Sequence, residues 1–209
     1  MAQLKIGRMV LGVYATNCYF LYNEGLGDAV VVDPADKGDR IYGALKEKGF
    51  RVAGILLTHG HFDHIWGANA LRELSGAKIY ALEAEKQLCE DAGLNVSAQA
   101  GRAYTVVPDV YVKDGEELTI ADITCKVIAT PGHTAGSCCY YFSDAGFLVC
   151  GDTIFLESVG RTDFPTGSSR ELISSVKEKI FVLPENVQLY PGHGESTTVE
   201  HEKKYNPFF

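Results

Sequence analysis

The sequence is poor in basic residues and has neither a long hydrophobic run nor a CxxC pair, and each absence excludes a class of protein. Its 19 lysines and arginines are outnumbered by 27 aspartates and glutamates, so the formal net charge is −8. A protein whose main partner is nucleic acid needs a basic face, and a membrane-spanning helix needs about 20 consecutive apolar residues. The N-terminus also lacks the basic-then-apolar pattern of a secretory signal. We therefore expect no nucleic-acid partner, no membrane partner and a cytoplasmic location.

The six cysteines lack the CxxC spacing of redox motifs and zinc sites. Most of them lie inside apolar stretches, where cysteine behaves as a small hydrophobic residue. Disulfides are rare in the cytosol. We therefore expect buried free thiols at Cys18, Cys89, Cys125, Cys138, Cys139 and Cys150.

Size and composition are those of a globular protein. The chain has 209 residues, of which 46% are hydrophobic and 22% are charged, and it contains no linker-like or low-complexity tract. A chain of this length can bury a sizeable core. We expect a single domain over residues 1–209, built as one unit or as two tightly fused halves. The expected elements come as one set of strands and helices followed by a second such set. This order predicts a core of two packed sheets with helices outside.

Half of the six histidines occupy one short stretch, residues 58–64, directly after an apolar run. Its sequence is Thr-His-Gly-His-Phe-Asp-His. Imidazole nitrogens and carboxylates are ligands of divalent transition metals. His59 and His61 are two residues apart, so in an extended turn both rings can face one ion. Asp63 and His64 follow at once and can face a second ion beside it.

Three later strand-like runs also end in a candidate ligand, which is His133, Asp152 or His193. In α/β proteins, binding sites form outside the carboxyl ends of strands. Asp33 follows another buried strand and is expected to be a turn residue, with support of the site from behind the ligands as the alternative. Only His201 falls outside the pattern of the other histidines, and we interpret it as a surface residue of a charged helix.

The remaining pattern predicts helices at defined places. Apolar spacing favours helices over residues 39–48 and 65–74. Capping boxes of the Ser/Thr-x-x-Glu type at 168–171 and 197–200 predict two further helix starts.

The stretch 58–64 carries the HxHxDH motif and resembles the metallo-β-lactamase superfamily. Residues 130–137, 151–152 and 191–193 match the later metal motifs of that superfamily in order, so the resemblance covers nearly the whole chain. It implies an α/β fold, the four-layer αβ/βα sandwich.

Within the superfamily, the chain is similar to the glyoxalase II group, the hydroxyacylglutathione hydrolases. The resemblance lies in Asn17-Cys18-Tyr19, in Gly-Asp-Thr at 151–153 and in residues 160–164. It points especially to the small bacterial members and to the related persulfide dioxygenases. Full-length glyoxalase II carries an additional C-terminal helical domain that supplies glutathione contacts, and the sequence resembles the small form without this domain.

The resemblance implies a dinuclear metal site. The expected cofactors are two divalent metal ions, which we expect to be zinc, with iron or manganese as alternatives. The implied ligands are His59, His61 and His133 for one ion, Asp63, His64 and His193 for the other, and Asp152 as a bridge between both.

Such a site indicates a metallohydrolase that acts on a small-molecule thioester. A zinc-bound water has a pKa of about 7, so hydroxide is available at neutral pH to attack the carbonyl of an S-acylglutathione-type thioester. Asp63 would be the catalytic residue that orients this nucleophile. Arg161 either pairs with a substrate carboxylate, whose geometry a guanidinium matches, or forms a surface salt bridge.

Two alternatives share the same ligands. A persulfide dioxygenase would hold one iron on His59, His133 and Asp152, which form a set of two histidines and one carboxylate. The other alternative is a non-catalytic, metal-stabilised binding protein, although structural sites are closed by four protein ligands. β-Lactamase or nuclease activity is disfavoured, because added substrate-recognition domains and basic surfaces are absent. The sequence does not indicate the oligomeric state.

Overall fold

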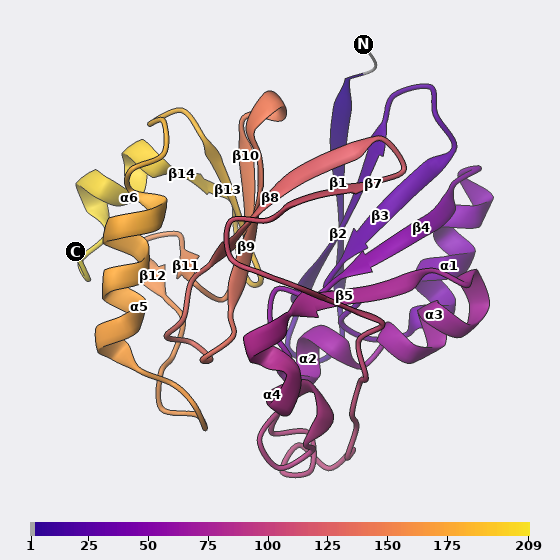
Figure 1. The fold of residues 1–209 in the computed structure, drawn as a ribbon, viewed down its shortest axis with the longest axis horizontal. Coiled ribbons are helices and arrows are strands. Elements are labelled where there is room, and N and C mark those ends of the chain that lie inside the picture. Colours follow the sequence, from indigo (N-terminus) through magenta and orange to yellow (C-terminus); the bar gives the residue numbers. More distant parts are fainter. Residues whose placement is uncertain (1–2) are drawn as a thin grey trace.

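The computed structural model describes residues 3–209 and has two β-sheets packed face to face, with helices on the outer side of each sheet (Figure 1). The predicted four-layer αβ/βα sandwich is confirmed. A sheet that contacts another sheet on one face and helices on the other needs apolar residues on both faces. The strand with the sequence Asp-Ala-Val-Val-Val meets this need, since its last four residues are all buried.

The six strands of the first sheet are arranged in their order along the chain. The first three pair antiparallel, and the third to the sixth pair parallel. Parallel strands bring their carboxyl ends to one edge, so the loops that follow them emerge together. The strands are β1 (Leu4–Leu11), β2 (Thr16–Asn23), β3 (Asp28–Val32), β4 (Arg51–Leu56), β5 (Lys78–Leu82) and β6 (Val110–Val112).

The second sheet has the order β14-β13-β10-β9-β8-β7. Its β10 and β13 are parallel and its other neighbours are antiparallel, so the carboxyl ends of β8, β10 and β13 lie at one edge. The strands are β7 (Glu117–Ile120), β8 (Ile123–Ala129), β9 (Cys138–Phe142), β10 (Phe147–Gly151), β13 (Gln188–Pro191) and β14 (Thr197–Thr198), with a separate hairpin of β11 (Ile154–Phe155) and β12 (Ser158–Val159).

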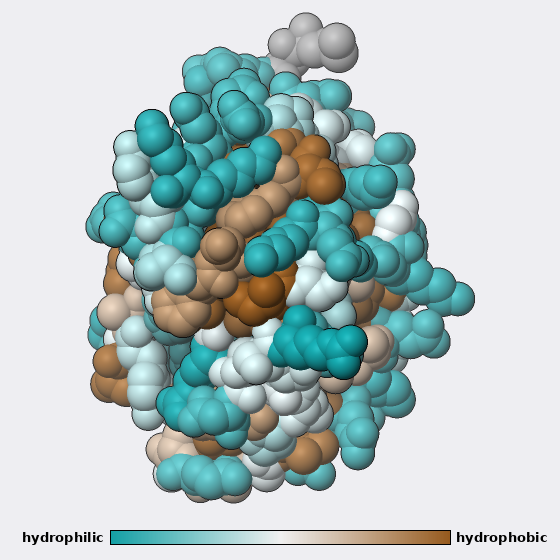
Figure 2. All heavy atoms as spheres, turned by 90° about the vertical axis from the view of Figure 1, so that its left-hand side faces the viewer, coloured by the Kyte–Doolittle hydropathy of each residue, from teal (hydrophilic) through white to brown (hydrophobic). Residues whose placement is uncertain are grey.

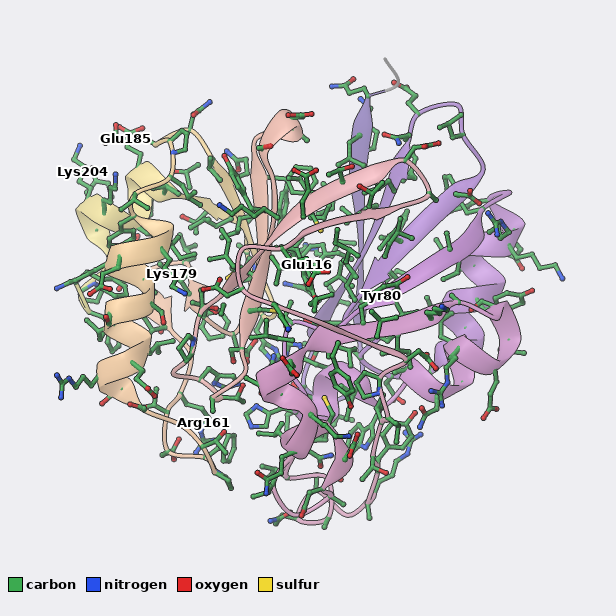
Figure 3. The ribbon with its side chains drawn as sticks, viewed as in Figure 1. Tyr80, Glu116, Arg161, Lys179, Glu185 and Lys204 are labelled. Atoms are coloured by element: carbon green, nitrogen blue, oxygen red, sulfur yellow. The ribbon has the colours of Figure 1, made fainter. Side chains whose placement is uncertain are left out.

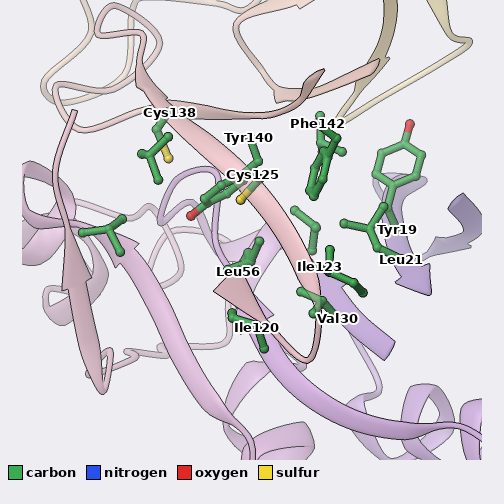
Figure 4. Close-up of a cluster of buried hydrophobic side chains, with 14 of the residues drawn as sticks. Tyr19, Leu21, Val30, Leu56, Ile120, Ile123, Cys125, Cys138, Tyr140 and Phe142 are labelled. Atoms are coloured by element: carbon green, nitrogen blue, oxygen red, sulfur yellow. The ribbon is translucent and has the colours of Figure 1, made fainter. Parts of the chain in front are cut away.

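Side chains from both sheets form the central core between them (Figure 4). Leu56 of β4 and Tyr140 of β9 belong to this one cluster. The Tyr140 hydroxyl donates to the carbonyl of Leu57 at 2.8 Å, and the amide of Cys138 donates to the carbonyl of Thr58 at 2.8 Å. The two sheets are therefore joined at the point where β4 ends. All six cysteines are buried and free, which confirms the expectation.

Helices cover the outer face of each sheet (Figure 1). Figure 2 shows the outer side of the second sheet's helical layer, where hydrophobic side chains are visible in the centre with hydrophilic ones around them. Among residues 3–209, no helix is long and apolar enough to cross a bilayer. The helices are α1 (Gly38–Glu47), α2 (Phe62–Ile65), α3 (Ala68–Ser75), α4 (Lys86–Glu90), α5 (Ser169–Ser175) and α6 (Val199–Tyr205), with 3-10 turns at Glu83–Glu85 and Ser143–Ala145 and a π-helical turn at Val176–Ile180.

The helix predicted over 39–48 is confirmed as α1, but the prediction over 65–74 is wrong at its start, because two helices, α2 and α3, form there. The break lies at Gly67, whose amide donates to the carbonyl of Pro34 at 2.8 Å. A Cβ at Gly67 would lie only 2.5 Å from that oxygen. The close approach of the loop after β3 therefore ends α2 and fixes where α3 begins.

One of the two predicted capping boxes is confirmed at its N-cap serine, while the Ser168 amide donates to the carbonyl of Gly132 at 2.7 Å instead of to the Glu171 side chain. Ser168 caps α5, and its Oγ accepts the amide of Glu171 at 3.3 Å. The prediction of Thr197 as a cap is wrong, since Thr198 caps α6 and its Oγ1 accepts the amide of His201 at 3.1 Å. Thr197 is paired within the second sheet, so the helix begins one residue later than expected.

Replacing Ser168 with alanine is expected to lower the free energy of unfolding by about 1 kcal/mol, because the amide of Glu171 loses its acceptor. Ser174→Ala is the matched control in the same helix. Ser174 is bonded to the Glu178 side chain on the surface, so its loss should change stability by no more than about 0.5 kcal/mol. Urea unfolding measures both values. Equal effects of the two substitutions would contradict the capping role.

Candidate metal centre

The loops that follow β4, β8, β10 and β13 meet at one end of the sandwich. They carry all the side chains predicted as metal ligands, and the structure gathers these into two adjoining groups with Asp152 between them. The loop after β4 belongs to the first sheet and the other three belong to the second. The cluster therefore exists only because the two sheets pack together.

His59, His61 and His133 form the first group. All three are buried, and their candidate ligand atoms lie within 4.8 Å of one another. The distance between His61 Nδ1 and His133 Nε2 is 2.8 Å. Burial is the largest cause of a lowered pKa in each imidazole, and for His61 the pKa falls to about 3. Neutral rings of this kind offer nitrogen lone pairs to a metal.

Asp63, His64 and His193 form the second group, again with candidate ligand atoms within 4.8 Å of one another. Asp63 Oδ2 lies 3.2 Å from His193 Nε2 and 3.8 Å from His64 Nε2. Burial alone would lower the pKa of His64, but three nearby aspartates outweigh burial and raise this pKa well above its usual value. The carboxylates therefore favour positive charge at this point, and a divalent cation also supplies it.

Asp152 lies between the two groups. Its Oδ1 is 3.3 Å from His64 Nε2, and its Oδ2 is 3.6 Å from His133 Nε2 and 3.5 Å from His193 Nε2. Burial would raise the pKa of Asp152, but the neighbouring histidines, His64 above all, lower it well below its usual range. The side chain is therefore an anion that reaches both groups.

Within residues 3–209, four buried side-chain atoms lack a hydrogen-bond partner, and all belong to this cluster: Nε2 of His59, His61 and His64, and Oδ1 of Asp152. Buried polar atoms in proteins are otherwise nearly always paired. Imidazole nitrogen and carboxylate oxygen are the donor set of zinc and of other divalent transition metals. The residues present therefore fit a divalent metal.

Asp33 bonds to residues of the cluster without being one of its predicted ligands. This supporting role was the alternative to the prediction of a simple turn residue. Its Oδ1 accepts the amide of Thr58 at 2.8 Å, and its Oδ2 accepts the Thr58 hydroxyl at 2.6 Å. His64 Nδ1 lies 2.9 Å from the same Oδ2. A carboxylate bonded to one ring nitrogen directs the other nitrogen towards a metal, so Asp33 orients His64 Nε2 into the cluster.

Backbone carbonyls orient two more of the histidines. His133 Nδ1 donates to the carbonyl of Arg161 at 2.7 Å, and His193 Nδ1 donates to the carbonyl of Tyr14 at 3.2 Å. Because a carbonyl can only accept, Nδ1 carries the proton in both rings and Nε2 carries the lone pair. Their Nε2 atoms are also the ones that lie beside Asp152.

Glu85, a buried carboxylate beside the cluster, was not predicted from the sequence. Its oxygens accept the amides of Gly60 and Gly136 and the hydroxyl of Thr134. Burial raises the pKa of Glu85 to about 7. These partners are 25, 49 and 51 residues away along the chain, so no local motif could have indicated the contacts.

Arg161 lies on the loop between β12 and α5 (Figure 3). Its guanidinium donates to Asp163 Oδ1 at 2.7 Å and lies over the Phe164 ring, 3.9 Å from the ring centre. Both side chains of the Arg161–Asp163 pair are more than half exposed, as in the surface salt-bridge interpretation. The Phe164 ring centre is 5.3 Å from that of His61, so an aromatic side chain borders the cluster on this side.

The chain is similar to proteins described as hydrolases. A probable metallo-hydrolase of Bacillus subtilis, YqgX, is 37% identical over 207 residues, which cover 98% of this chain and 97% of the relative. The hydroxyacylglutathione hydrolase GloC of Haemophilus influenzae is 31% identical over 202 residues, with 93% of each chain covered.

Three solved structures share the fold over nearly the whole chain. The B3 metallo-β-lactamase BLEG-1 has a TM-score of 0.93 at 37% identity and covers 98% of this chain and 99% of its own. TTHA1623 in a di-iron-bound form has a TM-score of 0.88 at 29% identity, with coverage of 97% and 100%. ETHE1 from Myxococcus xanthus has a TM-score of 0.81 at 27% identity, with coverage of 97% and 83%.

A family model matches residues 11–193, a span that begins in β1 and ends at His193 and so contains every member of the clustered histidine and aspartate set. The chain belongs to the metallo-β-lactamase superfamily.

Proposed function

We propose that the protein is a metal-dependent hydrolase of the glyoxalase II type, which cleaves S-acylglutathione-type thioesters. The observation that carries the proposal is the pair of adjoining ligand groups with the anion of Asp152 between them. The similarity to GloC over 93% of both chains supports this substrate class.

Two divalent ions would be held by the two groups. His59, His61 and His133 would bind the first, Asp63, His64 and His193 would bind the second, and Asp152 would contact both. We propose zinc, while the similarity to a protein in a di-iron-bound form supports iron as the alternative. A bound divalent ion polarises a carbonyl and brings the pKa of its water to about 7.

Asp63 is suited to orient the water that attacks the thioester. Its Oδ2 accepts the Thr16 hydroxyl at 3.0 Å and lies 3.2 Å from His193 Nε2. Burial would raise the pKa of Asp63, but His64 and His193 outweigh burial and hold it below its usual value. An ionised carboxylate accepts a hydrogen bond from water and so sets its direction. The leaving thiolate needs little protonation, so the proposed reaction does not require a separate acid.

Arg161 is our proposed contact for a substrate carboxylate. Its present partner, Asp163, forms an exposed pair, and such pairs contribute only about 0–1 kcal/mol. A substrate carboxylate can therefore replace Asp163 at little cost. The Phe164 ring beneath the guanidinium holds it beside the cluster.

The persulfide dioxygenase function is the second candidate. The similarity to a protein in an iron-bound form supports iron as the metal, and one iron on His59, His133 and Asp152 would have the two-histidine, one-carboxylate set of iron oxygenases. A non-catalytic role is less well supported, because structural zinc sites have four protein ligands and this cluster offers more.

Metal analysis and substrate assays of the purified protein test the proposal. We expect about two divalent ions per chain and release of free thiol from S-lactoylglutathione. A cephalosporin serves as the comparison substrate, because BLEG-1 is a metallo-β-lactamase, and we expect much slower turnover of it. One iron per chain with oxygen uptake on glutathione persulfide, and no thioester hydrolysis, would replace the proposal with the dioxygenase function.

Substitution of a ligand should remove metal and activity together. His59→Ala removes a donor of the first group and Asp152→Ala removes the carboxylate that would contact both ions, so we expect His59→Ala to lose the metal of the first group, Asp152→Ala to lose metal from both groups, and both proteins to lose thioesterase activity. His201→Ala is the control, because this histidine is partly exposed and pairs with Glu157 on the surface; metal content and turnover should be retained. Full turnover by His59→Ala protein that has lost the metal of the first group would rule out the mechanism.

Asp33→Asn is expected to weaken metal binding by about 10–100-fold, because the amide cannot replace the carboxylate that bonds both Thr58 and His64. Asp36→Asn is the control three residues away, since Asp36 forms an exposed pair with Arg102. Titration of the metal-free proteins with zinc gives both affinities. Unchanged affinity in the Asp33→Asn protein would show that this aspartate does not support the site.

A further inference from the structure

We propose that Glu85 is a positioning residue whose carboxylate fixes the loop after β4 and the loop after β8 relative to each other. Because these loops carry the three histidines of the first group, Glu85 would set the metal affinity of that group and not of the second. The inference rests on the proposed metal centre. Glu85 is not one of the predicted ligands, and it lies in the 3-10 turn at Glu83–Glu85 that leads into α4.

The hydrogen bonds of Glu85 reach both loops at once. Its Oε1 accepts the amide of Gly60 at 2.8 Å and the hydroxyl of Thr134 at 2.8 Å, and its Oε2 accepts the amide of Gly136 at 2.9 Å. Gly60 lies between His59 and His61, and Thr134 directly follows His133. One carboxylate therefore bonds to residues next to all three histidines of the first group.

The segment around Glu85 packs closely against both loops. A Cβ at Gly136 would lie 2.3 Å from the amide nitrogen of Glu85, and a Cβ at Gly60 would lie 2.8 Å from the sulfur of Cys89 in α4. Both loops therefore need glycine where the segment 83–90 lies against them. Because one loop follows β4 and the other follows β8, Glu85 joins the two sheets directly beside the cluster.

Glu85 has no comparable contact with the second group. One of its donors, Gly60, lies three residues before Asp63, but each ligand of the second group has a separate anchor: Asp63 bonds to Thr16, His64 to Asp33 and His193 to Tyr14. Loss of the Glu85 carboxylate should therefore loosen one metal position and leave the other in place. A residue that only stabilised the fold would affect both positions equally.

Glu202 provides a matched control. It is also fully buried and also accepts three hydrogen bonds, from the Thr197 hydroxyl, the amide of Glu157 and the Asn206 side chain. None of these donors adjoins a predicted ligand in the sequence. Glu202→Gln should therefore lower the melting temperature as Glu85→Gln does, while both metal affinities stay at the wild-type value.

The test measures zinc affinity at each position separately by calorimetric titration of the metal-free proteins. In a His193→Ala background, which leaves the first group intact, Glu85→Gln should weaken zinc binding by about 10–100-fold. In a His61→Ala background, which leaves the second group intact, Glu85→Gln should change affinity by less than about twofold. Thr134→Val, which deletes one of the three donors, should weaken the first position by less, and it keeps the test available if Glu85→Gln protein does not fold.

Equal weakening at both positions, or an effect of Glu202→Gln as large as that of Glu85→Gln, would overturn the inference, because general destabilisation would then explain the data. An unchanged affinity at the first position would also overturn it and would leave the proposed hydrolase intact. Wild-type protein that binds no zinc, iron or manganese would overturn the proposed metal centre itself.

Discussion

The structure depends on the burial of imidazoles and carboxylates in one small volume at the ends of strands from two sheets. Neutral rings at His59 and His61 lie beside the anion of Asp152 and the strongly basic His64. Such a collection is costly to bury unless a cation joins it. A divalent ion would compensate this buried charge and accept the unpaired donor atoms, so bound metal would add to the stability of the fold.

A set of contacts behind the ligands restricts their freedom. Asp33 orients His64, the carbonyl of Arg161 orients His133, and the carbonyl of Tyr14 orients His193. Glu85 does not touch a ring but fixes the backbone from which three rings project. Orientation is thus supplied by groups far from each ligand in the sequence, and this is the usual way in which proteins tune metal sites.

Features that depend on local sequence patterns, such as the metal ligands and one helix cap, could be predicted from the sequence. The ligands follow strand-like runs, so their convergence was predictable once the sandwich was inferred, and Ser168 was identifiable as a cap from its box alone. Glu85 was not predictable, because its donors are 25–51 residues away. The break at Gly67 depends on a carbonyl of another loop, and the shift from Thr197 to Thr198 depends on strand pairing. In each case a tertiary contact decided the outcome.

The contact between the first residues of β2 and the loop after β13 has a consequence for the order in which the site can form. The amide of Asn17 donates to the carbonyl of Gly192 at 2.7 Å, and Thr16 forms an isolated bridge with His193. The last ligand is therefore fixed by a strand, β2, that begins more than 170 residues before it in the chain. In a chain still emerging from the ribosome, the first histidines are made long before His193, so the second group can be completed only after the segment that carries His193 has been synthesised.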